Sequence, residues 1–431
     1  MLPMAARICT RLWYNCWLLG SIPLLAEEGW RDSRREARAR QGEASRKAGV
    51  PGWSVRRHCI ADLRLRLRPV GLALRATPFA PRFARAHPLL RPWRALASRP
   101  PLRGGESITH MNPFATIPIE ERYAEFHKRY PALNLIGNTR MVEILCFKEE
   151  LPEVRVYAKA EYTNPGGSLK DRPVRRMLLE ALIQGKIGKG QVVLDSSSGN
   201  AGIAYAMLGA MMNVPVQIVV PGNASKERKL RIQAHGAKLV QTDPLEGYDE
   251  ALREGHRIAD REPGKYFHCD QYANEHNWLS HYETTAPEIM AQTEGKATHF
   301  VAGIGTGGTV TGVGRRLKKD IPGVEIVQIV PEDFPGIEGL KPLENPADII
   351  PKILDQSVVD QKVRVSSAEA ARMCALLARY GIFAGQSSGA YLHGVYETAK
   401  RIRKGVIVTL LNDIGERYMS TGLWEFPQKG T

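Results

Sequence analysis

One lysine lies in a loop whose residue types favour covalent chemistry. Residues 164–172 read Asn-Pro-Gly-Gly-Ser-Leu-Lys-Asp-Arg, between an apolar run typical of a strand and a helical pattern at 173–184. Burial and the positive end of a helix both lower the pKa of a lysine, which favours the nucleophilic neutral amine. The alternative is a plain turn with Lys170 exposed to solvent, and for this loop alone that alternative is the more common one.

Two further loops have the composition of anion-binding sites. Residues 196–202 (Ser-Ser-Ser-Gly-Asn-Ala-Gly) and 303–309 (Gly-Ile-Gly-Thr-Gly-Gly-Thr) each follow a predicted strand and open a predicted helix. Free backbone N–H groups and small hydroxyls at a helix N-terminus bind carboxylate or phosphate. In the first loop Asn200 can also donate to a phenolate-like oxygen. The alternative for that loop is a serine-rich helix cap.

The 303–309 loop leaves a second interpretation open. Gly303, Gly305 and Gly308 have the spacing of a dinucleotide-binding loop, and Glu332 after the next strand is a candidate ribose-binding acid. Nothing else in the sequence completes such a site. A fourth small-residue turn, at 385–390, carries no meaning by itself. We expect no metal site, because five residues with metal-binding side chains fit no zinc spacing: His268, Cys269, Asp270, His276 and His281.

These loops lie between predicted strands and helices that alternate along the chain. Strand-like apolar runs are predicted at 154–157, 192–194, 216–220, 300–302, 326–330 and 406–411. The clearest helix is predicted at 367–380, where Ser366 and Glu369 form a capping box and Gly381 supplies the stop. This alternation predicts an α/β protein with parallel sheets, in which ligands bind at the carboxyl ends of strands.

The charge is concentrated in an Arg-rich leader, residues 1–110. The leader has 20 Arg and 1 Lys against 7 acidic residues, whereas residues 111–431 have 39 basic and 38 acidic ones. Three hypotheses for the leader are a targeting peptide, a basic arm for nucleic acid or anionic lipid, and a reading frame extended upstream of Met111. We favour the last, which makes the leader non-native, and expect disorder under all three.

The body itself gives little sign of a nucleic-acid or membrane partner. It is almost neutral, and no run of about 18 apolar residues is long enough for a membrane span. The six cysteines are widely spaced, without a CxxC pair. This usage favours reduced thiols and a cytoplasmic location.

Taken together, the four loops resemble, in order and spacing, the cysteine synthase family of fold-type-II pyridoxal-phosphate enzymes. The resemblance runs through nearly all of 133–424, from Leu-Ile-Gly-Asn-Thr at 135–139 to Gly-Glu-Arg-Tyr-Met-Ser-Thr at 415–421. It implies a fold like that of the tryptophan synthase β subunit, with two three-layer α/β domains and mostly parallel sheets. The catalytic domain would span 111–431, with an N-terminal half at about 150–270 and a C-terminal half at about 271–431. Residues of about 216–260 would move when substrate binds.

The same resemblance implies a role for each candidate residue around pyridoxal 5′-phosphate. Lys170 would hold the cofactor as a Schiff base and later act as general base. Asn200 would bond the cofactor's 3-hydroxyl, and Ser387 would face its pyridine nitrogen. The phosphate cradle would comprise Gly305, Thr306, Gly307, Gly308 and Thr309. The substrate carboxylate would be held by Ser197, Ser198, Gly199, Asn200 and Ala201, with Gln271 beside them.

A serine opposite the pyridine nitrogen also limits the types of reaction that the cofactor would favour. It cannot keep the ring protonated as an aspartate would, so the ring is a weaker electron sink and suits β-elimination and replacement. The resemblance therefore implies that an activated serine loses its β-substituent to give an aminoacrylate, to which a sulfur donor adds to form L-cysteine. The implied assembly is a homodimer.

Several positions depart from the family pattern and leave the substrate open. Arg140 stands at a usual proline, Ala201 at a usual threonine, and Ile414 near a common serine, while 272–277 replaces a Phe-x-Asn-Pro run. These departures resemble the B-type cysteine synthases. O-Acetylserine and O-phosphoserine remain alternative substrates; the sulfur can come from sulfide, thiosulfate or a sulfur-carrier protein. The alternative functions are a cystathionine β-synthase-type or a threonine synthase/dehydratase-type lyase and, in a different class, a non-catalytic binding protein with a basic arm.

Overall fold

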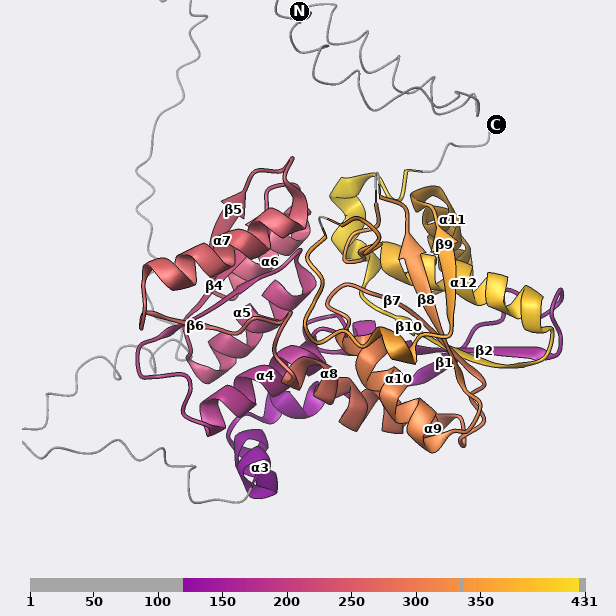
Figure 1. Ribbon diagram of the computed structural model, residues 1–431, viewed down its shortest axis with the longest axis horizontal. Helices are drawn as coiled ribbons and strands as arrows, with labels where there is room; N and C mark the ends of the chain where they lie inside the picture. Colours follow the sequence, from indigo (N-terminus) through magenta and orange to yellow (C-terminus); the bar gives the residue numbers. More distant parts are fainter. Residues whose placement is uncertain (1–118, 334–335, 347, 426–431) are drawn as a thin grey trace, which may run out of the picture. The chain divides into compact units, whose positions relative to one another are not determined.

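The structure is a computed structural model that describes residues 119–333, 336–346 and 348–425 (Figure 1). The Arg-rich leader and the three hypotheses for it lie outside these residues. The described chain is built on two sheets, one of six strands and one of four. Most of the strand pairs are parallel, so the predicted α/β class is confirmed.

The larger sheet runs in the order β1-β2-β10-β7-β8-β9. β1 pairs with β2 in antiparallel fashion, and the other neighbours are parallel. Every residue of β7 is buried, as expected for a parallel strand covered on both faces. The strands are β1 (Met141–Glu143), β2 (Val154–Ala160), β7 (His299–Gly303), β8 (Glu325–Pro331), β9 (Gln361–Val365) and β10 (Gly405–Leu411).

The smaller sheet runs in the order β5-β4-β3-β6, and all its pairs are parallel. Its strands are β3 (Val192–Ser196), β4 (Val216–Pro221), β5 (Lys238–Thr242) and β6 (Tyr266–His268).

Helices cover both faces of each sheet. In β8, Ile329 lies against Gly394 of α12, whereas Ile326 lies against Gly314 of α10. Residues three apart in a strand point to opposite faces, so α12 and α10 cover opposite faces of the larger sheet. The helices are α3 (Ile119–Arg129), α4 (Asp171–Ile183), α5 (Asn200–Met212), α6 (Lys226–Ala234), α7 (Gly247–Arg261), α8 (His276–Ser280), α9 (Ala286–Gln292), α10 (Gly308–Asp320), α11 (Ser367–Arg379) and α12 (Gln386–Ile402).

The smaller sheet follows the same rule. Ile218 in β4 contacts Gly202 of α5, and the next residue, Val219, belongs to a buried cluster with Ala251 and Ile258 of α7. The two helices therefore lie on opposite faces. Short 3₁₀ helices and one π-helical turn, η4, complete the described part of the chain: η2 (Pro131–Leu135), η3 (Glu161–Thr163), η4 (His281–Thr285), η5 (Gln356–Val358) and η6 (Gly415–Thr421).

The predicted strands and the predicted ends of the 367–380 helix agree with the structure. All six predicted strands are present, and α11 begins with the predicted capping box between Ser366 and Glu369. Gly381, after α11, has a φ of +79°, which suits its predicted role as the stop.

β2, which lies near the expected start of the N-terminal half, pairs with β10 and so belongs to the larger sheet. An apolar run predicts a strand but does not predict which sheet the strand joins.

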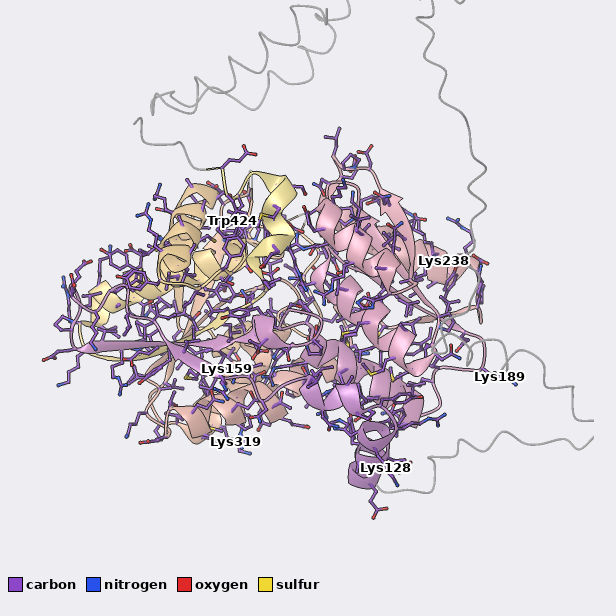
Figure 2. The ribbon with its side chains drawn as sticks, turned by 180° about the vertical axis from the view of Figure 1, so that it is seen from behind. Lys128, Lys159, Lys189, Lys238, Lys319 and Trp424 are labelled. Atoms are coloured by element: carbon purple, nitrogen blue, oxygen red, sulfur yellow. The ribbon has the colours of Figure 1, made fainter. Side chains whose placement is uncertain are left out.

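The buried interior contains charged groups as well as apolar ones. Lys159 of β2 is fully buried and pairs with Glu288 at 2.9 Å. Figure 2 shows Lys159 within the body of the molecule, whereas Lys128, Lys189, Lys238 and Lys319 lie at its edges. Nearby, Arg172 is also fully buried and pairs with Glu161 at 2.7 Å and with Glu288 at 2.7 Å. This network anchors the first turn of α4, two residues after Lys170.

Candidate active site

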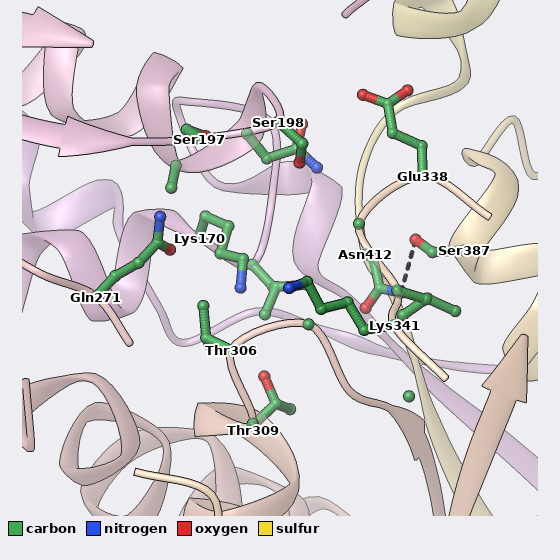
Figure 3. Close-up of a pocket in the computed structure, with 18 of the residues that line it drawn as sticks. Lys170, Ser197, Ser198, Gln271, Thr306, Thr309, Glu338, Lys341, Ser387 and Asn412 are labelled. Carbon is green, nitrogen blue, oxygen red and sulfur yellow. Dashed lines mark hydrogen bonds between the residues drawn. The ribbon is translucent and has the colours of Figure 1, made fainter. Parts of the chain in front are cut away.

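The predicted loops meet around one cavity (Figure 3). The cavity contains about 850 Å³ of space, including its mouth. Eleven of the candidate residues line it: Lys170, Ser197, Ser198, Asn200, Ala201, Gln271, Gly305, Thr306, Gly307, Thr309 and Ser387. The two candidates that do not line it are Gly199 and Gly308. Four helices, α4, α5, α10 and α12, begin at or beside these lining residues.

Lys170 immediately precedes α4 and is partly buried. Burial lowers its pKa from 10.5 to about 8, so a substantial fraction of its amine is neutral near physiological pH. The backbone of its loop is tied to the end of β10, because Leu169 N–H donates to the carbonyl of Asn412 at 2.9 Å. These features fit the nucleophilic amine predicted from the sequence.

The 196–202 loop is organised by one hydroxyl. Ser197 Oγ accepts hydrogen bonds from the N–H groups of Gly199 at 3.0 Å and Gly202 at 2.9 Å. Gly199 has a φ of +150°, and a Cβ there would lie 2.0 Å from Cδ of Arg228, so only glycine fits. Gln271 also holds this loop, because its Nε2 donates to the carbonyl of Ser196 at 2.6 Å.

Charged neighbours fix the orientation of the Asn200 amide. Its Nδ2 donates to Asp413 Oδ2 at 2.8 Å, and its Oδ1 accepts from Arg417 and, at 3.4 Å, from Arg228 Nε. Arg228 is buried between Glu338 and Asp413. A flipped amide would put N–H groups against two guanidinium groups, so the observed orientation is favoured. Within the described part of the chain Nδ2 donates only to Asp413, which leaves its second N–H for another acceptor.

The 303–309 loop has the features of a phosphate cradle. Within the described ranges, no group accepts a hydrogen bond from the N–H of Gly305, Thr306 or Gly307. Gly307 adopts a φ of +81°, which favours glycine, and α10 begins at the next residue. Unpaired N–H groups in front of a helix N-terminus form an anion site.

Two buried side chains hold the hydroxyls of this cradle. Asn277 Nδ2 donates to Thr306 Oγ1 at 3.1 Å, and His281 Nε2 lies 3.3 Å from Thr309 Oγ1. Burial lowers the pKa of His281 to about 3, so its imidazole is neutral. His281 therefore supports the cradle as a neutral hydrogen-bonding group.

Ser387 is the second residue of α12 and is buried. Its Oγ accepts a hydrogen bond from Asn412 Nδ2 at 3.0 Å, which Figure 3 shows as a dashed line. Asn412 comes directly after β10, at the carboxyl end of the strand.

Several lining residues were missed by the sequence reasoning: Tyr248, Tyr272, Glu338, Lys341, Tyr391 and Asn412. Lys341 forms an ion pair with Asp249 of α7, and its ammonium lies 5.6 Å and 5.3 Å from the ring centroids of Tyr248 and Tyr272. A signal existed for Asn412 alone, because it follows a predicted strand at the end where ligands bind.

The alternative ligands receive little support from the geometry. Among the residues that the structure describes, no group of three or more His, Cys, Asp and Glu side chains is arranged to hold a metal ion. Glu332, the candidate ribose-binding acid, accepts a hydrogen bond from the N–H of Ser367 at 2.6 Å and does not line the cavity. No helix in the described parts of the chain is long and apolar enough to cross a membrane.

A lysine whose pKa is lowered by burial, an anion-binding loop at a helix N-terminus and two mostly parallel sheets fit an enzyme of the pyridoxal-phosphate-dependent class. The family model described as pyridoxal-phosphate dependent enzyme matches residues 132–413. Cysteine synthase of Aquifex aeolicus is 47% identical over 304 residues, which cover 69% of this chain and 92% of that protein.

Two less similar relatives are also named cysteine synthases. Cysteine synthase B of Escherichia coli is 37% identical over 290 residues, which cover 67% of this chain and 94% of that protein. The crystal structure of cysteine synthase from Entamoeba histolytica has a TM-score of 0.64 at 32% identity, over 70% of this chain and 92% of that one. The chain belongs to the cysteine synthase family of pyridoxal-phosphate-dependent enzymes.

Proposed function

We propose that this chain forms L-cysteine by pyridoxal-phosphate-dependent β-replacement, using an activated L-serine and sulfide or another sulfur donor. The observation that carries the proposal is the cavity itself, where a lysine with a pKa of about 8 lies with three N–H groups that lack acceptors among the described residues. The proposal also places the protein in the cytoplasm as a homodimer.

The unpaired polar groups of the cavity fit the cofactor. The N–H groups of Gly305, Thr306 and Gly307 would hold its phosphate, together with the Thr306 and Thr309 hydroxyls and the N-terminus of α10. The free N–H of Asn200 would donate to its phenolic oxygen, and Ser387 would face its ring nitrogen. When bound, the cofactor supplies an electron sink for the carbon next to the substrate amine.

Lys170 has two tasks in this proposal. Its Nζ would bind the cofactor covalently and, once substrate displaces it, would take the proton from the α-carbon of the substrate. A pKa of about 8 suits both, because the amine must be neutral to attack and to accept a proton.

The substrate carboxylate would lie on the 196–202 loop, held by Ser197, Ser198 and the backbone of 199–201, with Gln271 beside it. Ala201 supplies no side-chain donor there, so the backbone takes a larger share of the binding. We propose O-acetylserine or O-phosphoserine as the activated serine, and sulfide, thiosulfate or a sulfur-carrier protein as the sulfur source.

The test uses the full chain and two matched lysine variants. Lys170→Ala is expected to abolish the yellow absorption band of lysine-bound cofactor and the release of cysteine from either activated serine with sulfide. Lys189→Ala, at an exposed lysine, is expected to keep both. A band that persists in Lys170→Ala would contradict the proposal, as would release of a 2-oxo acid from serine or threonine in place of cysteine.

A further inference from the structure

Asn412 has a hydrogen-bonding arrangement that the predicted roles do not explain. It lies at the carboxyl end of β10, lines the cavity, and is only 2% exposed. Its backbone links the 164–170 loop to α12, because its carbonyl accepts from Leu169 N–H at 2.9 Å and its N–H donates to Ser388 Oγ at 2.9 Å. These two hydrogen bonds hold the Asn412 backbone and so fix the point from which its side chain projects.

The direction of the hydrogen bonds around Asn412 follows from Tyr391. The single hydroxyl proton of Tyr391 is donated to the carbonyl of Gly303 at 3.2 Å. Burial raises the pKa of Tyr391 to about 12, and the Asn412 side chain, which lies beside the hydroxyl, lowers it as a hydrogen-bond donor does. Because the Tyr391 oxygen has no second proton, it can only accept from Asn412. The amide must therefore present its NH₂ group on this side of the cavity.

The hydrogen bond between Asn412 and Ser387 agrees with this orientation. The second N–H of the Asn412 amide donates to Ser387 Oγ at 3.0 Å, and Asn412 Oδ1 is buried without a partner within the described chain. No acceptor for the Ser387 hydroxyl proton occurs among the described residues. The Ser387 oxygen thus accepts a hydrogen bond from Asn412, and its O–H can donate to a group bound in the cavity.

We propose that Asn412 is a positioning residue that makes the Ser387 hydroxyl a hydrogen-bond donor towards the cofactor's ring nitrogen. The inference rests on the proposed function, because it takes the cofactor to lie with that nitrogen at Ser387. A ring nitrogen that accepts a hydrogen bond is unprotonated, and the positive N-terminus of α12 beside Ser387 also disfavours a ring cation. The series of polar groups from Gly303 through Tyr391 and Asn412 to Ser387 therefore favours β-replacement over reactions that need a protonated ring as a strong electron sink.

The primary test follows the ring nitrogen directly. Full-length chain is loaded with cofactor carrying ¹⁵N in the ring, and the nitrogen resonance is compared among the parent, Asn412→Asp, Asn412→Leu and Ser387→Ala. In Asn412→Asp the carboxylate can only accept, so it takes the Ser387 proton and leaves the serine oxygen facing the ring. The resonance is expected to move to the protonated position, and the ratio of α-proton exchange to replacement is expected to rise by about tenfold or more.

Asn412→Leu gives an independent result, because it removes the donor without adding an acceptor. Its resonance is expected to move from the parent position towards that of Ser387→Ala, with kcat lowered by roughly tenfold through the loss of one directed hydrogen bond. A parent-like resonance in cofactor-bearing Asn412→Leu would overturn the proposal even where Asn412→Asp fails to fold.

The double variant Ser387→Ala/Asn412→Asp tests whether the effect passes through Ser387. It is expected to return the ring to the unprotonated state. A ring that stays protonated would mean that the carboxylate acts on the nitrogen directly, and the positioning role would be wrong. Failure of the proposed function is distinguishable, because the parent chain itself would then bind no cofactor at Lys170.

Discussion

Replacing Lys170 by methionine should stabilise the cofactor-free protein at neutral pH. Burial lowers the pKa of this lysine from 10.5 to about 8, so the folded state disfavours the ammonium that the unfolded state accepts. Each pKa unit corresponds to about 1.4 kcal/mol, which gives a penalty of about 3 kcal/mol for the protonated lysine. Lys170 is partly exposed, so solvent screening reduces the expected penalty to about 2 kcal/mol.

The sign of the pH dependence follows from the same two pKa values. Below pH 8 both states bind the proton, and the folded state carries the full penalty. Between pH 8 and 10.5 the folded lysine is neutral while the unfolded lysine is still protonated, so stability rises with pH and the penalty disappears. The advantage of Lys170→Met should therefore be largest at pH 7 and shrink steadily towards pH 10.

Equilibrium urea unfolding of the cofactor-free parent and variant at pH 7, 9 and 10 measures this difference. Lys189→Met, at an exposed lysine, serves as the control and is expected to change the free energy of unfolding by less than about 0.5 kcal/mol at each pH. The reasoning is refuted if Lys170→Met destabilises the protein at pH 7, or if its advantage is the same at pH 7 and pH 10.

Three further predictions concern the supports of the site. Glu161→Gln breaks the pair with the fully buried Arg172, and should lower the free energy of urea unfolding by about 3 kcal/mol; a loss under about 1 kcal/mol would contradict this. Gly307→Ala should weaken cofactor binding by about tenfold or more in equilibrium dialysis, because φ is +81° and a Cβ would lie 2.8 Å from a leucine side chain. Gly190→Ala has the same φ of +81° with no atom within 4 Å, so it should leave binding unchanged. His281 should stay neutral in NMR titrations down to about pH 4, since burial lowers its pKa to about 3; stability then falls as pH drops below about 6.5, where the unfolded imidazole takes a proton that the folded one lacks.

The loops that bind anions were predictable because their chemistry resides in short contiguous segments. Glycines, hydroxyls and a following helix are adjacent in the chain, and a strand before them marks the binding edge of the sheet. The central strands were predictable for a similar reason, since β7 and β8 are buried on both faces and read as apolar runs.

Edge strands and long-range partners were not predictable in this way. β9 is largely exposed and reads Gln-Lys-Val-Arg-Val, so it has no continuous apolar run. Asp413 and Arg417 fix Asn200 across more than 200 residues of sequence. No local pattern encodes that contact, because it exists only once the end of β10 is brought beside the start of α5.

The four helices that begin at the cavity also bear on how cofactor binding could be lost or redesigned. Among the residues that the structure describes, the cavity lining contains two basic side chains, Lys170 and Lys341, and no arginine. Affinity for the phosphate would therefore be encoded mainly in backbone N–H groups and helix ends, which no single side-chain deletion removes. A lineage that abandoned phosphate binding would lose it through added Cβ atoms at glycines, and a designer who grafts this phosphate site onto another scaffold must transplant loop conformations before any side chain.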